Sequence, residues 1–102
     1  MQKMIQEVPR VTDSFFKLTE EITQYSQLDK KTKELILIGI FVAEGSKRGL
    51  KTHVERALTE GASKNEVISA IIFALPVMGI SKVNTSIEVA LEVLGELVYE
   101  AN

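Results

Sequence analysis

The chain has no cysteine among its 102 residues, no tryptophan and a single histidine, His53. Without a thiol it can form no disulfide, use no thiolate nucleophile and bind no zinc ion through sulfur. A metal site built by the protein would depend on carboxylates around His53, and the sequence contains no such cluster. We therefore expect neither a bound metal nor another cofactor.

Long apolar stretches and a large excess of one charge are missing as well. The longest apolar runs, residues 35–43 and 67–80, are shorter than the ~20 residues of a membrane-spanning helix. The N-terminus lacks the apolar stretch of a signal peptide. The net charge of −2 gives no basic field that would hold nucleic acid. We expect a cytoplasmic protein that binds neither membranes nor nucleic acid.

What is present is typical of a soluble helical domain. Apolar residues make up 45% of the chain and charged residues 25%, and 102 residues leave room for one core, so residues 1–102 are predicted to form a single domain. Apolar positions recur with the period of a helix, and glycine and proline fall between the periodic segments. The pattern predicts an all-α fold with helices at about 9 or 13 to 25, 29–45, 47–60, 63–76 and 80–100.

Local signals support these boundaries. Asp29 is a plausible N-cap and Gly45 a plausible C-cap of the second helix. Ser63 and Glu66 have the spacing of a capping box, and Pro76 is expected to break or kink the fourth helix.

The distribution of apolar residues predicts which helices lie inside. Residues 35–43 are apolar all round, so this helix is expected to be central and buried on every side. Phe73 and Met78 are expected in the core. The fifth helix has apolar residues on two sides and therefore needs two partners, one of which can be another subunit. Its heptad stripe comprises Ile80, Val83, Ile87, Ala90, Leu94, Leu97 and Ala101.

His53 lies on the helical face of Ser46 and Gly49, at spacings of three and four residues. Glu34 opens the apolar run of the preceding helix, and antiparallel packing across the short turn between the helices would bring Glu34 and His53 together. Such a pair, partly desolvated, can pass a proton. The alternative is an ordinary surface histidine and a glutamate favoured by the helix dipole.

A basic turn and helix face contain Lys47, Arg48, Lys51 and Arg56. Such residues are commonly solvated surface, and here they could also attract a small anionic molecule. Lys30, Lys31 and Lys33 stand at a helix start, where we expect an exposed end or a contact with an acidic neighbour.

Residues 28–75 resemble the carboxymuconolactone decarboxylase family, which includes the alkylhydroperoxidase D-like proteins. Glu34 and His53 match the glutamate and histidine of the family, and A-L-T-E-G-A at 57–62 matches the block that follows. The resemblance implies an alkylhydroperoxidase D-like helical bundle of about five to six helices. It also implies homotrimers, or homohexamers built from trimers.

The sequence departs from the peroxidase branch of the family at the redox motif. Ser46 and Gly49 occupy the two cysteine positions of C-x-x-C, so thiol-dependent peroxidase chemistry is excluded. The resemblance to the decarboxylase branch implies that Glu34 and His53 are catalytic acid–base groups. It also implies an anion clamp formed by Arg48, with Ser46 and Gly49 beside the substrate.

Three functions therefore stay open. The first is a decarboxylase-like lyase acting on a small carboxylated or lactone substrate through Glu34 and His53. The second is a non-catalytic ligand-binding or assembly protein with the family fold. The third is an accessory protein that docks on a partner through its fifth helix.

Overall fold

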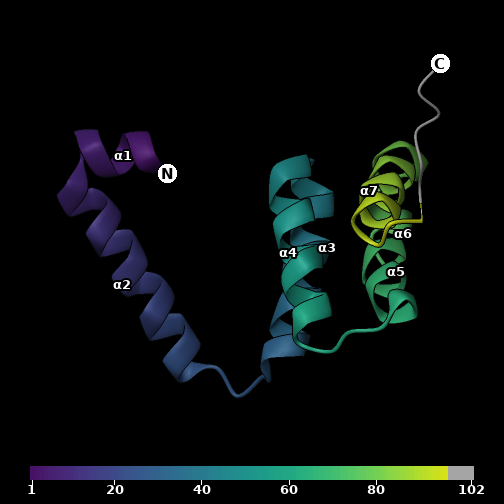
Figure 1. Cartoon of the computed structure of the whole chain (residues 1–102), viewed down its shortest axis with the longest axis horizontal. Helices are drawn as coiled ribbons and strands as arrows, with labels where there is room; N and C mark the ends of the chain where they lie inside the picture. Colours follow the sequence, from purple (N-terminus) through teal and green to yellow (C-terminus); the bar gives the residue numbers. More distant parts are fainter. Residues whose placement is uncertain (97–102) are drawn as a thin grey trace.

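A computed structural model describes residues 1–96, which form seven α-helices and no strand (Figure 1). The prediction of an all-α fold is confirmed. In chain order the helices are α1 (Gln2–Glu7), α2 (Pro9–Tyr25), α3 (Lys30–Glu44), α4 (Lys47–Thr59), α5 (Lys64–Ile72), α6 (Leu75–Met78) and α7 (Ile80–Val93). Within this part of the chain, no helix combines the length and the apolar character needed to cross a bilayer.

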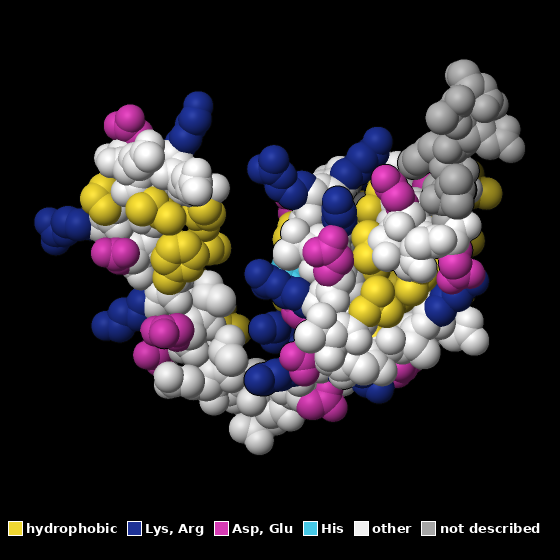
Figure 2. Space-filling model, viewed as in Figure 1, with side chains coloured by type: hydrophobic (Ala, Val, Ile, Leu, Met, Phe, Trp, Pro, Cys, Tyr) yellow, Lys and Arg dark blue, Asp and Glu magenta, His cyan; other side chains and the backbone are white. Residues whose placement is uncertain are grey.

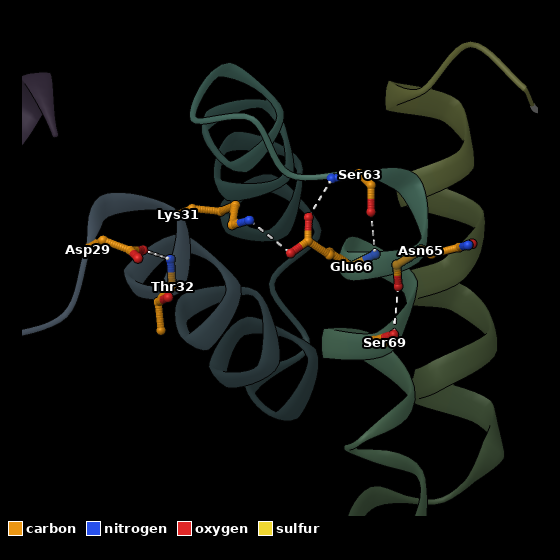
Figure 3. Close-up of polar contacts among 7 residues, drawn as sticks. All are labelled: Asp29, Lys31, Thr32, Ser63, Asn65, Glu66 and Ser69. Atoms are coloured by element: carbon orange, nitrogen blue, oxygen red, sulfur yellow. Dashed lines mark hydrogen bonds and ion pairs between the residues drawn. The ribbon is translucent and has the colours of Figure 1, made fainter.

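The predicted helix caps are present. The carboxylate of Asp29 accepts a hydrogen bond from the backbone N–H of Thr32 at 2.7 Å, and Gly45 ends α3 in the left-handed region with φ of 82°. Ser63 and Glu66 form the complete capping box at the start of α5 (Figure 3). These contacts join residues within three positions of each other, which is why the sequence alone could place them.

The two ends of the helical region differ from expectation. The short helix α1 was not predicted, whereas α2 begins at Pro9, one of the two expected starts. The last helix was expected to reach residue 100, but α7 ends at Val93. Gly95 adopts a φ of 74°, and the backbone N–H of Glu96 donates to the carbonyl of Leu91 at 2.8 Å, the pattern of a Schellman ending. The stripe positions Leu97 and Ala101 lie outside the described residues.

The predicted break near Pro76 is confirmed, and it separates two helices. Helix α5 ends at Ile72, and Pro76 then lies in the first turn of the four-residue helix α6. A proline is tolerated there because the first turn of a helix has no partner for its backbone N–H groups. Gly79, with φ of 85°, separates α6 from α7.

Helices α3, α4, α5 and α7 pack together around one core, and we call α3–α7 the body. Burying a large aliphatic side chain contributes about 1.5–3 kcal/mol before the entropy cost of ordering it. The buried apolar residues are Ile38, Val42, Leu50, Val54, Ala57, Ala62, Val67, Ile71, Val83 and Ala90. An ion pair at the rim, from Lys31 Nζ to Glu66 Oε2 at 3.0 Å, links α3 to α5 (Figure 3).

Helix α3 is central, but the expectation that it is buried on every side is wrong. Ile36 is 47% exposed and Ile40 is 52% exposed, so part of the surface of α3 stays uncovered although α4, α5 and α7 pack against it. Phe73 was also expected in the core and is 81% exposed, while Met78 is half-buried.

The first two helices form an arm, residues 2–25, that stands away from the body (Figure 1). Helices α1 and α2 pack chiefly against each other, and hydrophobic side chains gather on the surface of the arm (Figure 2). Its large exposed apolar residues are Met4, Ile5, Val8, Val11, Phe15, Phe16, Leu18, Ile22 and Tyr25.

Candidate acid–base site

Glu34 and His53 meet where the sequence predicts. Nδ1 of His53 lies 2.8 Å from Oε1 of Glu34 and 3.4 Å from Oε2. Glu34 is in the second turn of α3 and His53 is near the middle of α4, and the turn at Gly45 and Ser46 lets the two helices pack side by side. The predicted contact between helices is therefore confirmed.

The pair lies in a largely water-free position. The side chain of Glu34 is 4% exposed and that of His53 is 14% exposed. A single proton serves their contact: when Nδ1 carries it, the carboxylate accepts, and when the carboxyl group carries it, Nδ1 accepts. The arrangement can therefore hold a proton on either partner and transfer it over one short hydrogen bond.

The second ring nitrogen of His53 points to a different environment. Nε2 has no hydrogen-bond partner among residues 1–96. In that part of the chain, every fully buried side-chain nitrogen or oxygen atom has a hydrogen-bond partner. Nε2 must therefore reach the surface, where it can exchange protons with water.

The ring of Phe41 covers one face of the imidazole. The two ring centroids lie 5.0 Å apart with an interplanar angle of 14°. Phe41 also fills the space beside Gly49, because a Cβ atom built at position 49 would lie 2.5 Å from two ring carbons of Phe41. Gly49, which occupies one of the two cysteine positions of the redox motif in the peroxidase branch, is thus packed against an aromatic ring.

A cavity of about 350 Å³ opens beside Glu34, where the end of α2, the start of α3 and the end of α4 come together. Its polar lining contains cations, carboxylates and hydroxyl groups: Lys30, Lys33, Arg56, Glu34, Glu60, Thr23, Ser26 and Thr59. Glu34 belongs to the wall of this cavity, and His53 lies behind it. The glutamate is therefore the member of the pair that a small molecule in the cavity would meet.

The three predicted substrate-binding residues lie at the other end of α4. Ser46 is the N-cap of α4, and its hydroxyl oxygen accepts a hydrogen bond from the N–H of Gly49 at 3.1 Å. Arg48 is exposed in the first turn. None of the three lines the cavity beside Glu34, and Arg48 is about 12 Å from Arg56 along the helix axis.

Four residues around the pair were not assigned to the site from the sequence. Phe41 is seven positions after Glu34 and Arg56 three positions after His53, so each shares a helix face with a member of the pair. Lys30 and Lys33 precede Glu34 by four and one positions. The sequence shows the helical spacing of these residues, but the cavity that three of them line forms only when the chain folds.

No group of three histidine, aspartate or glutamate side chains in the described region gathers closely enough to hold a metal ion.

The sequence matches the carboxymuconolactone decarboxylase family over residues 9–92. The chain belongs to this family. Glu34 and His53 both lie within the span that matches the carboxymuconolactone decarboxylase family, as do the three cations of the cavity. No curated protein and no solved structure was found to match the chain.

Proposed function

We propose that this member of the carboxymuconolactone decarboxylase family is a lyase that removes a carboxylate from a small carboxylated lactone, with Glu34 and His53 as its acid–base groups. The observation that carries the proposal is the 2.8 Å contact between the two side chains. The side chain of Glu34 is 4% exposed and that of His53 is 14% exposed, and Glu34 lines a cavity. Positioned acid–base groups of this kind contribute about 10²–10⁴-fold to a reaction rate.

The proposed step balances without a further reactant. The bond between the substrate carbon and its carboxylate breaks, CO₂ leaves, and the bonding electrons enter a conjugated lactone carbonyl as an enolate. Glu34 donates its proton to the carbon as the carbonyl re-forms, and the resulting carboxylate accepts a hydrogen bond from the N–H at Nδ1 of His53. Water then protonates Nε2, and the proton at Nδ1 passes to Glu34, so that the carboxyl group is restored and the imidazole stays neutral. The net change replaces one carboxylate by one proton on carbon.

The test follows CO₂ release from carboxymuconolactone and then from other small carboxylated lactones, in D₂O, so that deuterium at the product carbon reports the protonation step. Glu34→Gln is expected to lower kcat/KM by at least about 100-fold, and His53→Ala to lower it similarly. Glu44→Gln, an exposed glutamate at the end of α3, is the matched control and should leave the rate unchanged.

Equal rates in wild type, Glu34→Gln and His53→Ala would contradict the proposal. Absence of turnover across the whole set of lactones, in a protein that still binds them, would favour the non-catalytic ligand-binding alternative.

We further propose that the chain is a homo-oligomer, in which the arm of one copy packs on the body of a second copy. Residues Val11, Phe15, Leu18 and Ile22 repeat every four and three positions along α2 and form an exposed apolar stripe. If each of the nine large apolar residues of the arm exposes roughly 90 Å², the arm presents about 800 Å² of surface, the contribution of one partner to a standard interface.

The body offers a matching surface. Two adjoining grooves of about 420 and 270 Å³ lie between α3, α5 and α6, and Gly39, Ala70 and Phe73 line both of them. Ile36 borders one groove and Val77 the other, and both side chains are exposed. Large exposed apolar patches of this kind mark interaction surfaces. An arm-to-groove contact joins unlike surfaces, and contacts of this kind form a ring when the rotation between copies closes. The family resemblance implies that this ring is a trimer or hexamer.

Light scattering coupled to size exclusion tests the assembly. Wild type should run as a trimer or hexamer, and Phe15→Ser/Leu18→Ser or Phe73→Ser/Val77→Ser should run as smaller species. Lys17→Ser/Glu21→Ser changes two polar residues of the same helix α2 and should match wild type. A monomeric wild type at roughly 100 μM would overturn the proposal, since standard interfaces hold at that concentration.

A further inference from the structure

We infer that the cavity beside Glu34 is a carboxylate-binding site in which Lys33 and Arg56, supported by Lys30, hold the anionic group of a small organic acid. Binding in this cavity can be measured without turnover, and only the claim that the bound acid reacts there rests on the proposed function. The site is distinct from the clamp predicted at Arg48, which does not line the cavity.

The charge of the cavity supports this assignment. Three cations line it, against the two carboxylates of Glu34 and Glu60, although the chain as a whole has a net charge of −2. Among residues 1–96, none of the three cations forms an ion pair, while Glu34 is already engaged by His53. Figure 2 shows lysine and arginine side chains along the edge of the body that faces the arm.

The hydrogen-bonding capacity of the lining narrows the side-chain donors to these cations and Ser26. The hydroxyls of Thr23 and Thr59 already donate to the backbone carbonyls of Thr19 and Glu55, whereas the hydroxyl of Ser26 accepts from a backbone N–H and keeps its own proton to donate. A carboxylate offers acceptors only, and the charged donors bind it more strongly than a neutral hydroxyl does. The guanidinium of Arg56 can bind it through two parallel hydrogen bonds, and a lysine ammonium adds a point charge.

The size of the cavity limits the ligand. A volume of about 350 Å³ is at the small end of ligand pockets, which suits an organic acid of a few carbon atoms. A carboxylate held by Arg56 and Lys33 would place the rest of such a molecule against Glu34, which shares the same wall. The inferred ligand class is therefore a small mono- or dicarboxylate.

Succinate and acetate are the probes, each titrated against the full chain by calorimetry and by NMR at low ionic strength, with sodium chloride of equal ionic strength as the blank. His53 is the only histidine, so its ring protons give one resolved reporter next to the cavity. Saturable succinate binding that shifts the His53 signals is expected. Lys33→Gln/Arg56→Gln should weaken it at least tenfold, whereas Lys47→Gln/Arg48→Gln, with the same charge change at the other end of α4, should leave it within about twofold.

Two results would overturn the inference: no saturable binding of either acid to wild type, or loss of binding in Lys47→Gln/Arg48→Gln but not in Lys33→Gln/Arg56→Gln. Glu34→Gln separates the two proposals, because removing a carboxylate from the wall should retain or tighten succinate binding while abolishing turnover. Binding without turnover in wild type refutes the lyase alone. Turnover whose KM is unchanged by Lys33→Gln/Arg56→Gln refutes the carboxylate site alone.

Discussion

The ring of Phe41 lies nearly parallel to the imidazole of His53, with the centroids 5.0 Å apart. The same ring occupies the space beside Gly49, one turn before His53 on α4. Phe41 therefore couples two residues of α4 through a side chain of α3. Contact with Glu34 fixes the edge of the imidazole that carries Nδ1, and contact with Phe41 fixes its face.

Gly49→Ala should disturb this stack. The new Cβ would lie 2.5 Å from two ring carbons of Phe41 and 3.0 Å from a third, so the ring must move away from its place against His53. Overpacking costs about 1–3 kcal/mol, which outweighs the gain of up to ~1 kcal/mol from replacing glycine by alanine in a helix. Chemical denaturation should show a net loss of roughly 1 kcal/mol, and the NMR signals of His53 should shift.

The double variant Phe41→Leu/Gly49→Ala provides the control. Leucine lacks the ring that the alanine methyl group meets, so the two effects should be strongly non-additive. Additive losses would show that Phe41 and Gly49 do not share the space that the structure gives them.

Breaking the Glu34–His53 contact should destabilise the fold, because it leaves a buried polar group without its partner. His53→Ala is expected to cost about 1–3 kcal/mol of unfolding free energy. Glu34→Gln should cost less, since an amide oxygen can still accept from Nδ1. A double-variant cycle measured by urea unfolding should give a coupling energy of about 1 kcal/mol or more, and a coupling near zero would contradict the contact.

Acid should weaken the start of α5. Hydrogen bonding from the backbone N–H of Ser63, and secondarily the contact with Lys31, holds the pKa of Glu66 below its ordinary value of 4.5. A carboxyl group with a lowered pKa in the folded state contributes stability above its unfolded pKa, and this contribution is lost as the pH falls through the folded value. The melting temperature of wild type should therefore exceed that of Glu66→Gln near pH 7.

Thermal unfolding followed by circular dichroism, from about pH 7 to about pH 3, measures this difference. The gap between wild type and Glu66→Gln should narrow on acidification below the ordinary value of 4.5. A gap that stays constant over this range would show that the charge of Glu66 does not contribute.

Replacing glycine by alanine should change the stability of the fold in opposite directions at two positions. Gly61 ends α4 with φ of 89°, a conformation that costs an L-residue about 1–2 kcal/mol, so Gly61→Ala should lower stability. Gly39 is within α3, where a Cβ would make an ordinary contact at 3.7 Å with the carbonyl of Ala70. Gly39→Ala should therefore raise stability by up to ~1 kcal/mol. Changes of the same sign in calorimetric melting temperatures would contradict this account.

Much of the local structure was predictable because it depends on neighbours in the chain. The caps at Asp29 and Ser63 and the glycine ending at Gly45 are contacts within a few residues. The meeting of Glu34 with His53 spans nineteen positions, yet it was predictable too, because both residues lie beside apolar stripes and at similar distances from the short turn between their helices.

By itself the sequence determined most of the helices, their caps and the contact of Glu34 with His53. Only the tertiary structure decided which surfaces stay open: it leaves Ile36, Ile40 and Phe73 uncovered, holds the arm away from the body, and brings Lys33 and Arg56 to one cavity. The reason is physical. Helical periodicity tells which residues share a face, but whether another helix covers that face depends on contacts between segments that are distant in the chain.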